Sequence, residues 1–419
     1  MMPSAPTSFG SILRQYRERI HLTQVELADL SAVSIRAIRN LELGRSTNPR
    51  RETVRLLADA LRLSGERRAA LHLAAGHDAD RSTFDQALSH VPSMGGSAVE
   101  RERETEAVVA LVGRGTQRVI RVTGFAGVGK TRLARAVSEE VLRKLRMPSL
   151  WVPLNGTASR DASLLPWAEG LAAGGRRAAD ELASLLGQRS VLLVLDGNDT
   201  GQVPDEAIDV LTGRCPNVNV LVTSRCPGEQ SEDYHLPLRP LTVTSSPGEP
   251  SPAVNLLVRS ILRIDPTFRV TEPVLADLAS LAGRLDGLPR ALESAASWFL
   301  LSTAHELART ADLEPLSLTV PPTHSTGDWV RDACTMAVSS LSPESRLLLD
   351  LVTADPQAGS LEELALRSGM GRLEAARAMH SLVLRGLIQP SPSTEEPGLR
   401  FSALHLVRHT LTAPQPSMR

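Results

Sequence analysis

The spacing of apolar residues changes character along the chain. Over the first 75 residues, apolar side chains recur at the three- to four-residue spacing that is typical of helices. Short, largely apolar runs follow, such as "VIRV" and "VLLVL", which are typical of strands buried in a parallel sheet. From about residue 251 the helical spacing returns. The pattern predicts a multidomain protein with an all-α N-terminal domain, an α/β domain with a parallel sheet, and a mainly helical C-terminal part.

Breaks in this periodicity set the expected domain boundaries. Residues 77–98 lose the pattern and contain Pro92, Gly95 and Gly96, so we interpret them as a linker. The expected order is a helical domain at 7–76, the linker at 77–98, the α/β domain at 99–240, a helical subdomain at 251–315, a domain of helices with a small β wing at 335–412, and a tail at 413–419.

Capping residues predict two short helices in the N-terminal domain. Thr23 can cap a helix that begins at Gln24, with Glu26 as its capping-box partner. After the turn "SAV", Ser34 can cap a second helix, which Gly44 ends. Two helices joined by three or four residues form a helix-turn-helix.

The second of these helices has a polar face that is suited to reading bases. Arg36, Arg39 and Asn40 are expected to face outward, where arginine can bind guanine and asparagine can bind adenine. Residues 1–75 also contain 12 arginines against 7 acidic residues, although the whole chain has a net charge of −1. The N-terminal domain is therefore the candidate for binding double-stranded DNA, the alternative being that these arginines form only a solvated face.

Residues 9–75 resemble the phage-repressor-like (XRE) helix-turn-helix family. The resemblance rests on Gln24 at the start of the second helix, on "SIRAIRNLE" as the recognition helix and on the following "NPRRETVRLLADAL". It implies a buried ion pair between Arg17 and Glu42, and it implies that Gln24, Arg50 and Arg51 contact DNA. The expected DNA-binding residues are then Gln24, Ser34, Arg36, Arg39, Asn40, Arg50 and Arg51.

The segment "GFAGVGKT" lies between an apolar strand and a helix start, and it fits the phosphate-binding pattern G-x-x-x-x-G-K-[ST]. Gly124, Gly127 and Gly129 allow backbone N–H groups to converge on one anion. Lys130 is suited to reach the β- and γ-phosphates, and Thr131 to bind Mg²⁺. Only two of the 46 basic residues are lysines, so a lysine at this position is informative.

Two further strands end in residues that would complete a nucleotide site. Asp196 follows "VLLVL" and is the expected Walker B acid and second Mg²⁺ ligand. Arg225 ends "VTSR" and could contact a γ-phosphate. We therefore expect ATP or ADP with Mg²⁺ as cofactors, and Lys130, Asp196 and Arg225 as catalytic residues. The loop residues expected to bind the nucleotide are Gly124, Gly127, Val128, Gly129, Lys130, Thr131 and Arg132.

The ordered motifs "GFAGVGKT", "LLVLDGND", "VTSR", "GLPRAL" and "RFSALHLVRH" make residues 99–412 resemble the NB-ARC form of the STAND class of P-loop ATPases. That class includes many actinobacterial regulators. The resemblance implies that Arg101 contacts the adenine, that Pro289 packs on it, and that His405, from a winged helix, contacts the β-phosphate of ADP. For His405, an ordinary half-buried surface histidine is the alternative interpretation.

The chain departs from the family pattern at several positions. Arg290 replaces the usual leucine of "GLPL", and Leu406 replaces the aspartate that follows the histidine. Gly197 stands where many hydrolytic relatives have a second carboxylate, so any ATP hydrolysis is expected to be slow.

Composition restricts the remaining possibilities. Aromatic residues make up only 3% of the chain, so the core must consist mainly of aliphatic side chains. The three cysteines lack the spacing of a zinc site or a disulfide framework. No stretch of eighteen uninterrupted apolar residues and no signal-peptide pattern is visible, so we expect a cytoplasmic protein without a membrane partner.

The sequence thus favours a nucleotide-gated transcription regulator. ADP would hold it closed, and ATP would open it, changing oligomerisation and binding to a two-half-site operator. The expected partners are double-stranded DNA, an adenine nucleotide, a second copy of the chain, and a protein that brings the signal if the nucleotide itself does not. Two alternatives stay open: an ATPase of a defence or stress assembly that uses its N-terminal domain for protein contacts, and a DNA-binding protein with a permanently ADP-filled scaffold.

Overall fold

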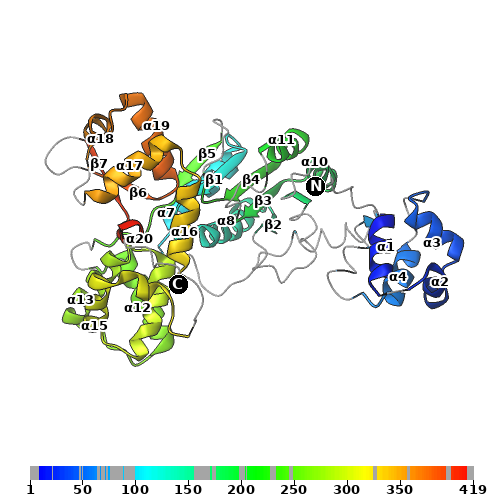
Figure 1. Ribbon diagram of the computed structural model, residues 1–419, viewed down its shortest axis with the longest axis horizontal. Helices are drawn as coiled ribbons and strands as arrows, with labels where there is room; N and C mark the ends of the chain where they lie inside the picture. Colours follow the sequence, from blue (N-terminus) through cyan, green and yellow to red (C-terminus); the bar gives the residue numbers. More distant parts are fainter. Residues whose placement is uncertain are drawn as a thin grey trace, which may run out of the picture. The chain divides into compact units, whose positions relative to one another are not determined.

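Figure 1 shows the elements of the chain as a computed structural model, coloured from the N-terminal helices in blue to the C-terminal helices in red. The structure describes residues 9–20, 22–46, 49, 51–63, 67, 71, 74–75, 88, 100–154, 170–171, 176–197, 203, 205–226, 233–244, 249–323, 328–355, 359–392 and 398–412. The expected linker, apart from Leu88, and the expected tail at 413–419 lie outside the described residues.

The N-terminal domain is built from short helices around a small aliphatic core. Gly10 allows two of the helices to approach closely, because a Cβ placed there would lie 2.2 Å from the carbonyl oxygen of Leu41. Leu13, Leu27 and Ile38 are fully buried. The described helices are α1 (Phe9–Arg19), α2 (Gln24–Ser31), α3 (Ile35–Glu42) and α4 (Arg51–Ala60).

The predicted caps of the helix-turn-helix are confirmed. The Thr23 hydroxyl accepts a hydrogen bond from the backbone N–H of Glu26, whose carboxylate accepts the N–H of Thr23 in return. The Ser34 hydroxyl accepts the N–H of Ala37 and so caps α3. Gly44 follows α3 with a φ of +67°, a conformation that suits glycine at a helix end.

The ion pair predicted between Arg17 and Glu42 is also confirmed. Nε of Arg17 lies 2.7 Å from Oε1 of Glu42, and Nη2 lies 2.9 Å from Oε2. The side chains are only 11% and 3% exposed. Gln24 joins this pair by donating its Nε2 to Oε2 of Glu42 at 2.7 Å. The pair connects α1, the start of α2 and the end of α3.

The α/β domain contains a five-stranded sheet in the order β2-β3-β4-β1-β5, in which β1 pairs in parallel with β4 and β5. Ile120 of β1 is in register with Leu221 of β4 and with Tyr234 of β5. This order brings the carboxyl ends of β1, β3 and β4 to one edge of the sheet, where open α/β sheets bind ligands. The strands are β1 (Val119–Thr123), β2 (Ser149–Pro153), β3 (Val191–Asp196), β4 (Val218–Thr223) and β5 (Tyr234–Pro237).

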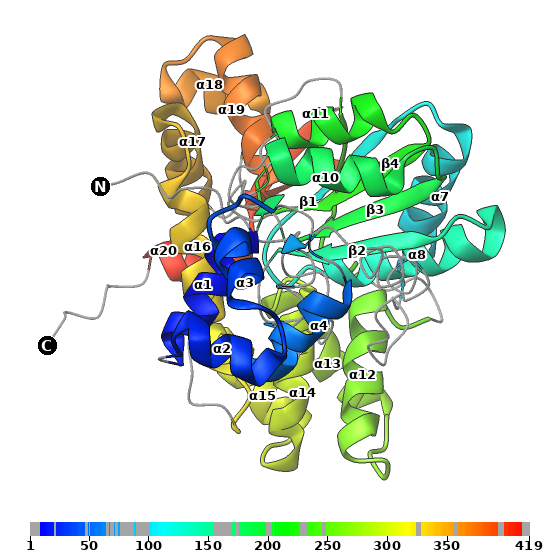
Figure 2. The same cartoon turned by 90° about the vertical axis from the view of Figure 1, so that its right-hand side faces the viewer.

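Helices accompany the strands. In Figure 2, α7 (Glu102–Arg114) lies with α8 (Lys130–Leu145), and α10 (Arg176–Leu186) lies beside α11 (Asp205–Arg214). The first four strands in chain order are buried along their whole length. Three of them, β1, β3 and β4, were predicted from their apolar runs, whereas β2 was not.

One buried position of β1 holds a charge that the sequence analysis did not anticipate. Arg121 is 2% exposed, and it pairs with Asp233 and, at 2.6 Å, with Asp205. The two aspartates come from the segment before β5 and from the start of α11, so this triad ties both to β1.

The helical subdomain follows the sheet. Gly287 forms the predicted break in "DGLPRAL": its carbonyl accepts the N–H of Leu241, and a Cβ placed on it would lie 2.1 Å from the Leu241 oxygen. The elements are α12 (Pro252–Ile264), α13 (Glu272–Arg284), α14 (Pro289–Ala296), the short 3₁₀ helices η1 (Ser297–Leu300) and η2 (Pro315–Thr319), and α15 (Ala304–Leu313).

The C-terminal part consists of helices and one antiparallel hairpin. In that hairpin Pro390 is in register with Phe401. The elements are α16 (Trp329–Ser339), α17 (Pro343–Ala354), α18 (Leu361–Ser368), α19 (Arg372–Leu384), β6 (Ile388–Pro392), β7 (Leu399–Ala403) and α20 (His405–Thr412). Throughout the described part of the chain, no helix combines the length and the apolar character that crossing a membrane requires.

The Arg17–Glu42 pair gives a direct test of the N-terminal domain. Removing either partner leaves the other charge buried, so we expect Arg17→Ala or Glu42→Ala to lower the local free energy of unfolding by roughly 3 kcal/mol or more. Hydrogen exchange of residues 9–60, followed in the full chain by mass spectrometry, measures this. Arg14→Ala is the control, because its 2.7 Å pair with Glu18 is exposed and should contribute little. Equal exchange in the Arg17 and Arg14 variants would contradict the prediction.

Candidate functional sites

The loop between β1 and α8 has the backbone geometry that phosphate binding requires. Gly124, Gly127 and Gly129 all have positive φ angles, of 141°, 76° and 104°. A Cβ on Gly124 would lie 2.7 Å from the carbonyl oxygen of Leu238, so a side chain is excluded there by space as well as by conformation. The loop leads directly into α8, whose N-terminal N–H groups favour an anion.

Lys130 is the first residue of α8 and is held across this loop. Its Nζ donates to the carbonyl oxygen of Gly124 at 2.8 Å and to that of Phe125 at 3.1 Å. The residue is only 9% exposed. The ammonium is therefore positioned by main-chain atoms at the loop that would hold the phosphates.

The acid predicted at the end of β3 lies beside the first turn of α8. Asp196 Oδ1 accepts hydrogen bonds from the hydroxyls of Thr131, at 2.8 Å, and of Thr223, at 2.7 Å. Thr223 also accepts the backbone N–H of Gly197 at 2.8 Å. Thr223 was missed in the sequence analysis, although it belongs to the motif "VTSR"; its signal is that it ends a strand adjacent to the one that ends in the acid.

A second cation lies close to this carboxylate. Arg135, one turn after Thr131 on α8, interacts electrostatically with Asp196, and partial burial lowers the pKa of Arg135. The sequence analysis did not single it out. Its spacing of four residues from Thr131, on the same face of a helix, is the signal that could have found it.

Residues from the C-terminal half contact the middle of the loop. The N–H of Arg290 donates to the carbonyl oxygen of Gly127 at 3.1 Å. A Cβ on Gly127 would lie 2.7 Å from Cη2 of Trp329 and 2.9 Å from Cβ of Arg290. The Arg290 guanidinium stacks on the Trp329 ring, with Cζ 4.6 Å from the ring centroid. Gly127 is thus the point at which α14 and α16 touch the loop.

A second contact comes from the turn between α19 and β6. Gly386 has a φ of +70°, and a Cβ placed on it would lie 2.5 Å from the backbone nitrogen of Phe125. The preceding Arg385 donates to the sulfur of Cys226 at 3.0 Å and to the hydroxyl of Ser340 at 2.9 Å. This turn therefore contacts both the start of the loop and the segment after β4.

The remaining predicted nucleotide-binding residues are distributed around the loop. Pro289 lies against Gly129, with its Cγ 3.9 Å from the position of a Cβ there. Arg132 forms a bidentate pair with Glu293 of α14, at 2.6 and 2.9 Å. Val128 is fully buried.

Arg101 is 7% exposed and pairs with Glu104 at 2.7 Å. It also donates to the carbonyl oxygen of Arg239 at 2.6 Å and, at 3.4 Å, to that of Val128. Arg101 was expected to contact the adenine, and its guanidinium lies at the main chain of the loop residue Val128.

Arg225 lies just past β4, and its Nη1 is 3.6 Å from the sulfur of Met336 on α16. Burial lowers the pKa of Arg290, and the nearby charge of Arg225 lowers it further. Together with Lys130, these residues make the region around the loop rich in positive charge.

His405 is the first residue of α20, and its described contacts are with the helical subdomain and with its own helix. Its Nδ1 lies 3.1 Å from the carbonyl oxygen of Arg284, and its ring centroid lies 4.8 Å from that of His409. The carboxylate of Asp286 accepts the N–H groups of His405 and Leu406, at 2.7 and 2.8 Å. Asp286 therefore caps α20 from the turn that follows α13.

Burial changes the pKa of the Asp286 carboxyl group that caps α20. It raises the pKa of Asp286 to about 7, against the hydrogen bonds from Leu406 and His405 and the charge of Arg408, which lower it. Burial, followed by the charge of His409, lowers the pKa of His405.

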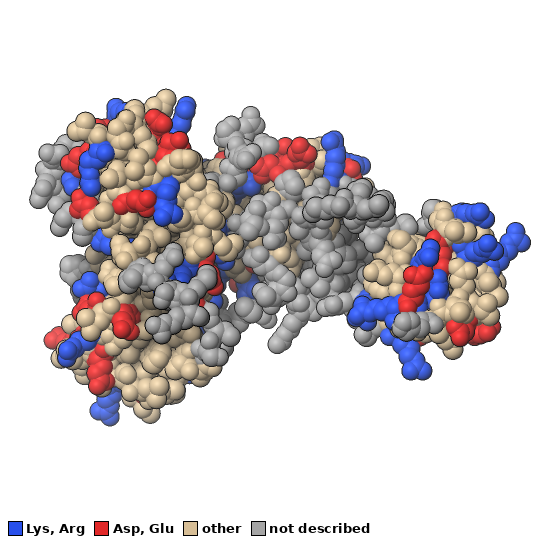
Figure 3. Space-filling view, in the orientation of Figure 1, with Lys and Arg blue, Asp and Glu red and all other residues tan. Residues whose placement is uncertain are grey.

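The predicted base-reading face of α3 is solvent-accessible. Arg36 and Arg39 are exposed, Asn40 is partly exposed, and Ile38 and Leu41 are buried beneath them. Figure 3 shows Arg side chains projecting from this domain among fewer Asp and Glu side chains. Ser34 caps α3, and Gln24 is bound to Glu42 as described above. Arg50 and the side chain of Arg51 lie outside the described residues.

Ile35, the first residue of α3, was missed in the sequence analysis. It is 45% exposed beside the predicted contacts. An exposed apolar side chain at this position can pack against the methyl group of thymine.

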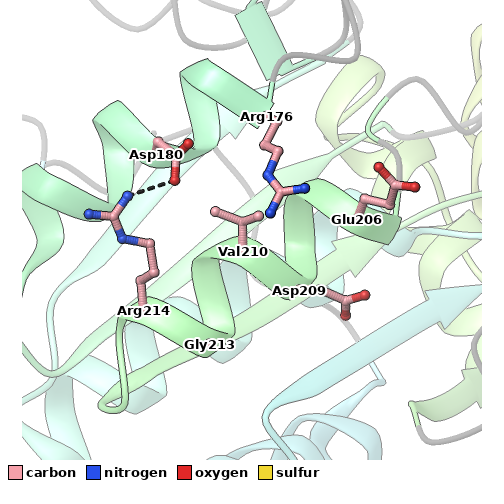
Figure 4. Close-up of a pocket in the computed structure, with 7 residues that line it drawn as sticks. All are labelled: Arg176, Asp180, Glu206, Asp209, Val210, Gly213 and Arg214. Atoms are coloured by element: carbon pink, nitrogen blue, oxygen red, sulfur yellow. Dashed lines mark hydrogen bonds and ion pairs between the residues drawn. The ribbon is translucent and has the colours of Figure 1, made fainter.

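A surface hollow between α10 and α11 offers no comparable chemistry. Figure 4 shows basic and acidic side chains alternating around it, with Arg214 paired to Asp180 at 2.6 Å. Its lining residues are Arg176, Asp180, Glu206, Asp209, Val210, Gly213 and Arg214. The mixed charge favours no single class of ligand.

The helix-turn-helix, the parallel sheet and the glycine loop at the end of β1 define a helix-turn-helix domain fused to a P-loop ATPase module. In agreement, residues 8–71 match a family described as a helix-turn-helix domain. A Mycobacterium tuberculosis protein that carries the name of an HTH-type transcriptional regulator, Rv0890c, is 29% identical over 186 residues, which are 43% of this chain and 20% of that protein.

Another M. tuberculosis protein, Rv0894, is described as uncharacterized and is 25% identical over 272 residues, which are 63% of this chain and 64% of that protein. The chain therefore spans a fifth of the first relative and less than two thirds of the second. Among solved structures, the Walker-type ATPase PABY2304 of Pyrococcus abyssi is 13% identical with a TM-score of 0.45, over 77% of this chain and 100% of that one.

The raised pKa of Asp286 predicts a pH dependence of stability. The folded chain holds the proton of this carboxyl more tightly than the unfolded chain, so its contribution to stability is present below about pH 4 and is lost as pH rises toward 7. Between pH 5 and 8 we expect wild type to lose stability relative to Asp286→Asn by on the order of 1–4 kcal/mol. Urea unfolding of both proteins at several pH values measures this difference. Both proteins contain His405, so its contribution to the pH dependence largely cancels in the comparison. A constant difference would contradict the prediction.

Proposed function

We propose that this chain is a nucleotide-gated, DNA-binding transcription regulator of the STAND type, in its NB-ARC form. ADP holds the ATPase module closed, and exchange for ATP opens it. The observation that carries the proposal is that C-terminal elements touch the phosphate loop directly, through Gly386 at Phe125 and through Arg290 and Trp329 at Gly127. A ligand that enters the loop therefore acts on the same atoms that hold those elements.

The described residues fit an adenine nucleotide with Mg²⁺. Mg²⁺ takes oxygen ligands from one or two protein groups and from phosphates, and the Thr131 hydroxyl and Asp196 carboxylate lie 2.8 Å apart. Bound there, the ion would neutralise phosphate charge. Thr223 orients Asp196, and Lys130 supplies a fixed positive charge. Gly197 provides no carboxylate to orient water, which supports slow hydrolysis and a switch rather than a rapid ATPase.

The energy required for such a switch is modest. Changing a two-state equilibrium from 1:99 to 99:1 takes about 5.5 kcal/mol of differential binding. Hydrogen bonds to charged groups contribute roughly 1.5–3 kcal/mol each, so two to four of them suffice. In the closed form, α17–α19 and the hairpin β6–β7 serve as the winged helix that covers the loop.

The output of the switch is DNA binding by the N-terminal domain, which is of the phage-repressor (XRE) type. Arg36, Arg39 and Asn40 on α3 read bases in the major groove, and a homodimer or larger oligomer that forms on opening binds two half-sites about 34 Å apart. The match of residues 8–71 to a helix-turn-helix family and the name of the mycobacterial relative support this output.

Lys130 gives the main test of gating. We expect Lys130→Ala to weaken ADP and ATP binding by roughly 100-fold, because it removes the ammonium from the phosphate loop. It should also remove the difference in DNA affinity between the ADP- and ATP-bound protein. Calorimetry and retention on genomic DNA fragments measure the two effects. Lys144→Ala, at the only other lysine, is the matched control, because that side chain is partly exposed and pairs with Glu140. Equal DNA affinity with ADP, with ATP and in the Lys130 variant would exclude gating.

The recognition helix is tested by Arg39→Ala. Loss of one base contact should weaken binding to the selected operator by roughly 5–150-fold while changing non-specific binding much less. Fluorescence anisotropy with operator and scrambled duplexes separates the two. Arg14→Ala removes the same charge from α1 and should change both affinities only slightly. If the two variants lose operator affinity equally, α3 does not read the sequence.

A further inference from the structure

Arg290 is the residue at the loop whose role the resemblance leaves unassigned, because the related proteins have leucine there. It is the second residue of α14, and its N–H donates to Gly127. Its backbone position is therefore fixed to the loop, while its side chain is only partly exposed to solvent.

The surroundings of its guanidinium are electrostatically unfavourable. Partial burial lowers the pKa of Arg290, and the charge of Arg225 lowers it further. Among the described residues, its guanidinium has the Trp329 ring as its partner and makes no ion pair with a carboxylate. An anion placed between Arg290 and Arg225 would stabilise the charged guanidinium and so offset both the burial and the repulsion from Arg225.

The Trp329 ring is held firmly in place. Its Nε1 donates to the carbonyl oxygen of Thr319 at 2.8 Å, and Asp328 caps the helix that it begins. The ring lies against Gly127. Arg290 can therefore leave the ring while the ring itself stays, and a phosphate bound at Gly127 would lie within reach of the released guanidinium.

We propose that Arg290 recognises the terminal phosphate of a nucleoside triphosphate in this loop. With a diphosphate bound, the guanidinium stays on Trp329. With a triphosphate bound, it leaves the ring and donates to the γ-phosphate together with Arg225. Because Trp329 begins α16, losing this stack weakens the hold of α16 on the loop and so favours opening.

This inference rests on the proposed nucleotide site, but it makes a separate claim about one residue. The ligand class follows from the geometry: a planar guanidinium binds phosphate oxygens in a bidentate manner, and Gly127 belongs to the loop that would hold the preceding phosphates.

The test compares ADP with a non-hydrolysable ATP analogue, AMPPNP, both with Mg²⁺, on the full chain. Arg290→Leu should weaken AMPPNP binding by roughly 10–100-fold while leaving ADP binding within about threefold, because only the γ-phosphate contact is lost. Retained ADP binding shows that the variant is folded. Arg309→Leu is the matched control, since it makes the same exchange at an exposed position of α15 and should change neither affinity.

Tryptophan fluorescence supplies a second measurement. AMPPNP, but not ADP, should change the emission of Trp329 as the guanidinium leaves its ring, and this change should be absent in both Trp329→Phe and Arg290→Leu. If Arg290→Leu weakens ADP and AMPPNP equally, or neither of them, the proposal for Arg290 is overturned. If wild type binds neither nucleotide, or Lys130→Ala binds both as tightly as wild type, the proposed nucleotide function fails instead.

Discussion

The three glycines of the loop between β1 and α8, Gly124, Gly127 and Gly129, determine how closely the rest of the ATPase module can approach that loop. A Cβ on Gly124 would clash with the carbonyl oxygen of Leu238, which follows β5. A Cβ on Gly127 would clash with the Trp329 ring and with the Cβ of Arg290. Main-chain and ring atoms from three distant segments thereby approach the same backbone. A loop with ordinary residues could bind neither a phosphate nor these neighbours, so ligand binding and domain contact depend on the same glycines.

The N-terminal domain depends on a different kind of interaction. Its small core is closed by the ion pair of Arg17 with Glu42, which Gln24 extends to the first turn of α2. Glu42 ends α3, so the pair fixes both helices of the helix-turn-helix relative to α1. The exposed face of α3 is then free to carry arginines for DNA, because none of them is needed for the internal packing.

Much of this could be predicted from the sequence, because the relevant signals are local. The caps at Thr23 and Ser34, the glycine loop and the acid at the end of β3 each lie within a few residues of the element they define. The Arg17–Glu42 pair, which spans 25 residues, was accessible only through family resemblance.

Contacts between distant segments that belong to no recognised motif could not be predicted. The triad of Arg121 with Asp205 and Asp233 joins segments 84 and 112 residues away from the arginine, and no periodicity relates them. The same holds for the cap that Asp286 places on α20. Single-sequence patterns report which face of an element is apolar, but they do not report which partner covers it.

The contact of Gly386 with Phe125 joins main chain to main chain, whereas the face of α3 consists largely of charged side chains. Dissolved ions screen the second kind of interaction and scarcely affect the first. A rise in ionic strength would therefore weaken DNA binding by the N-terminal domain while leaving this main-chain contact at the loop unchanged. The two parts of the chain thus differ in their sensitivity to salt.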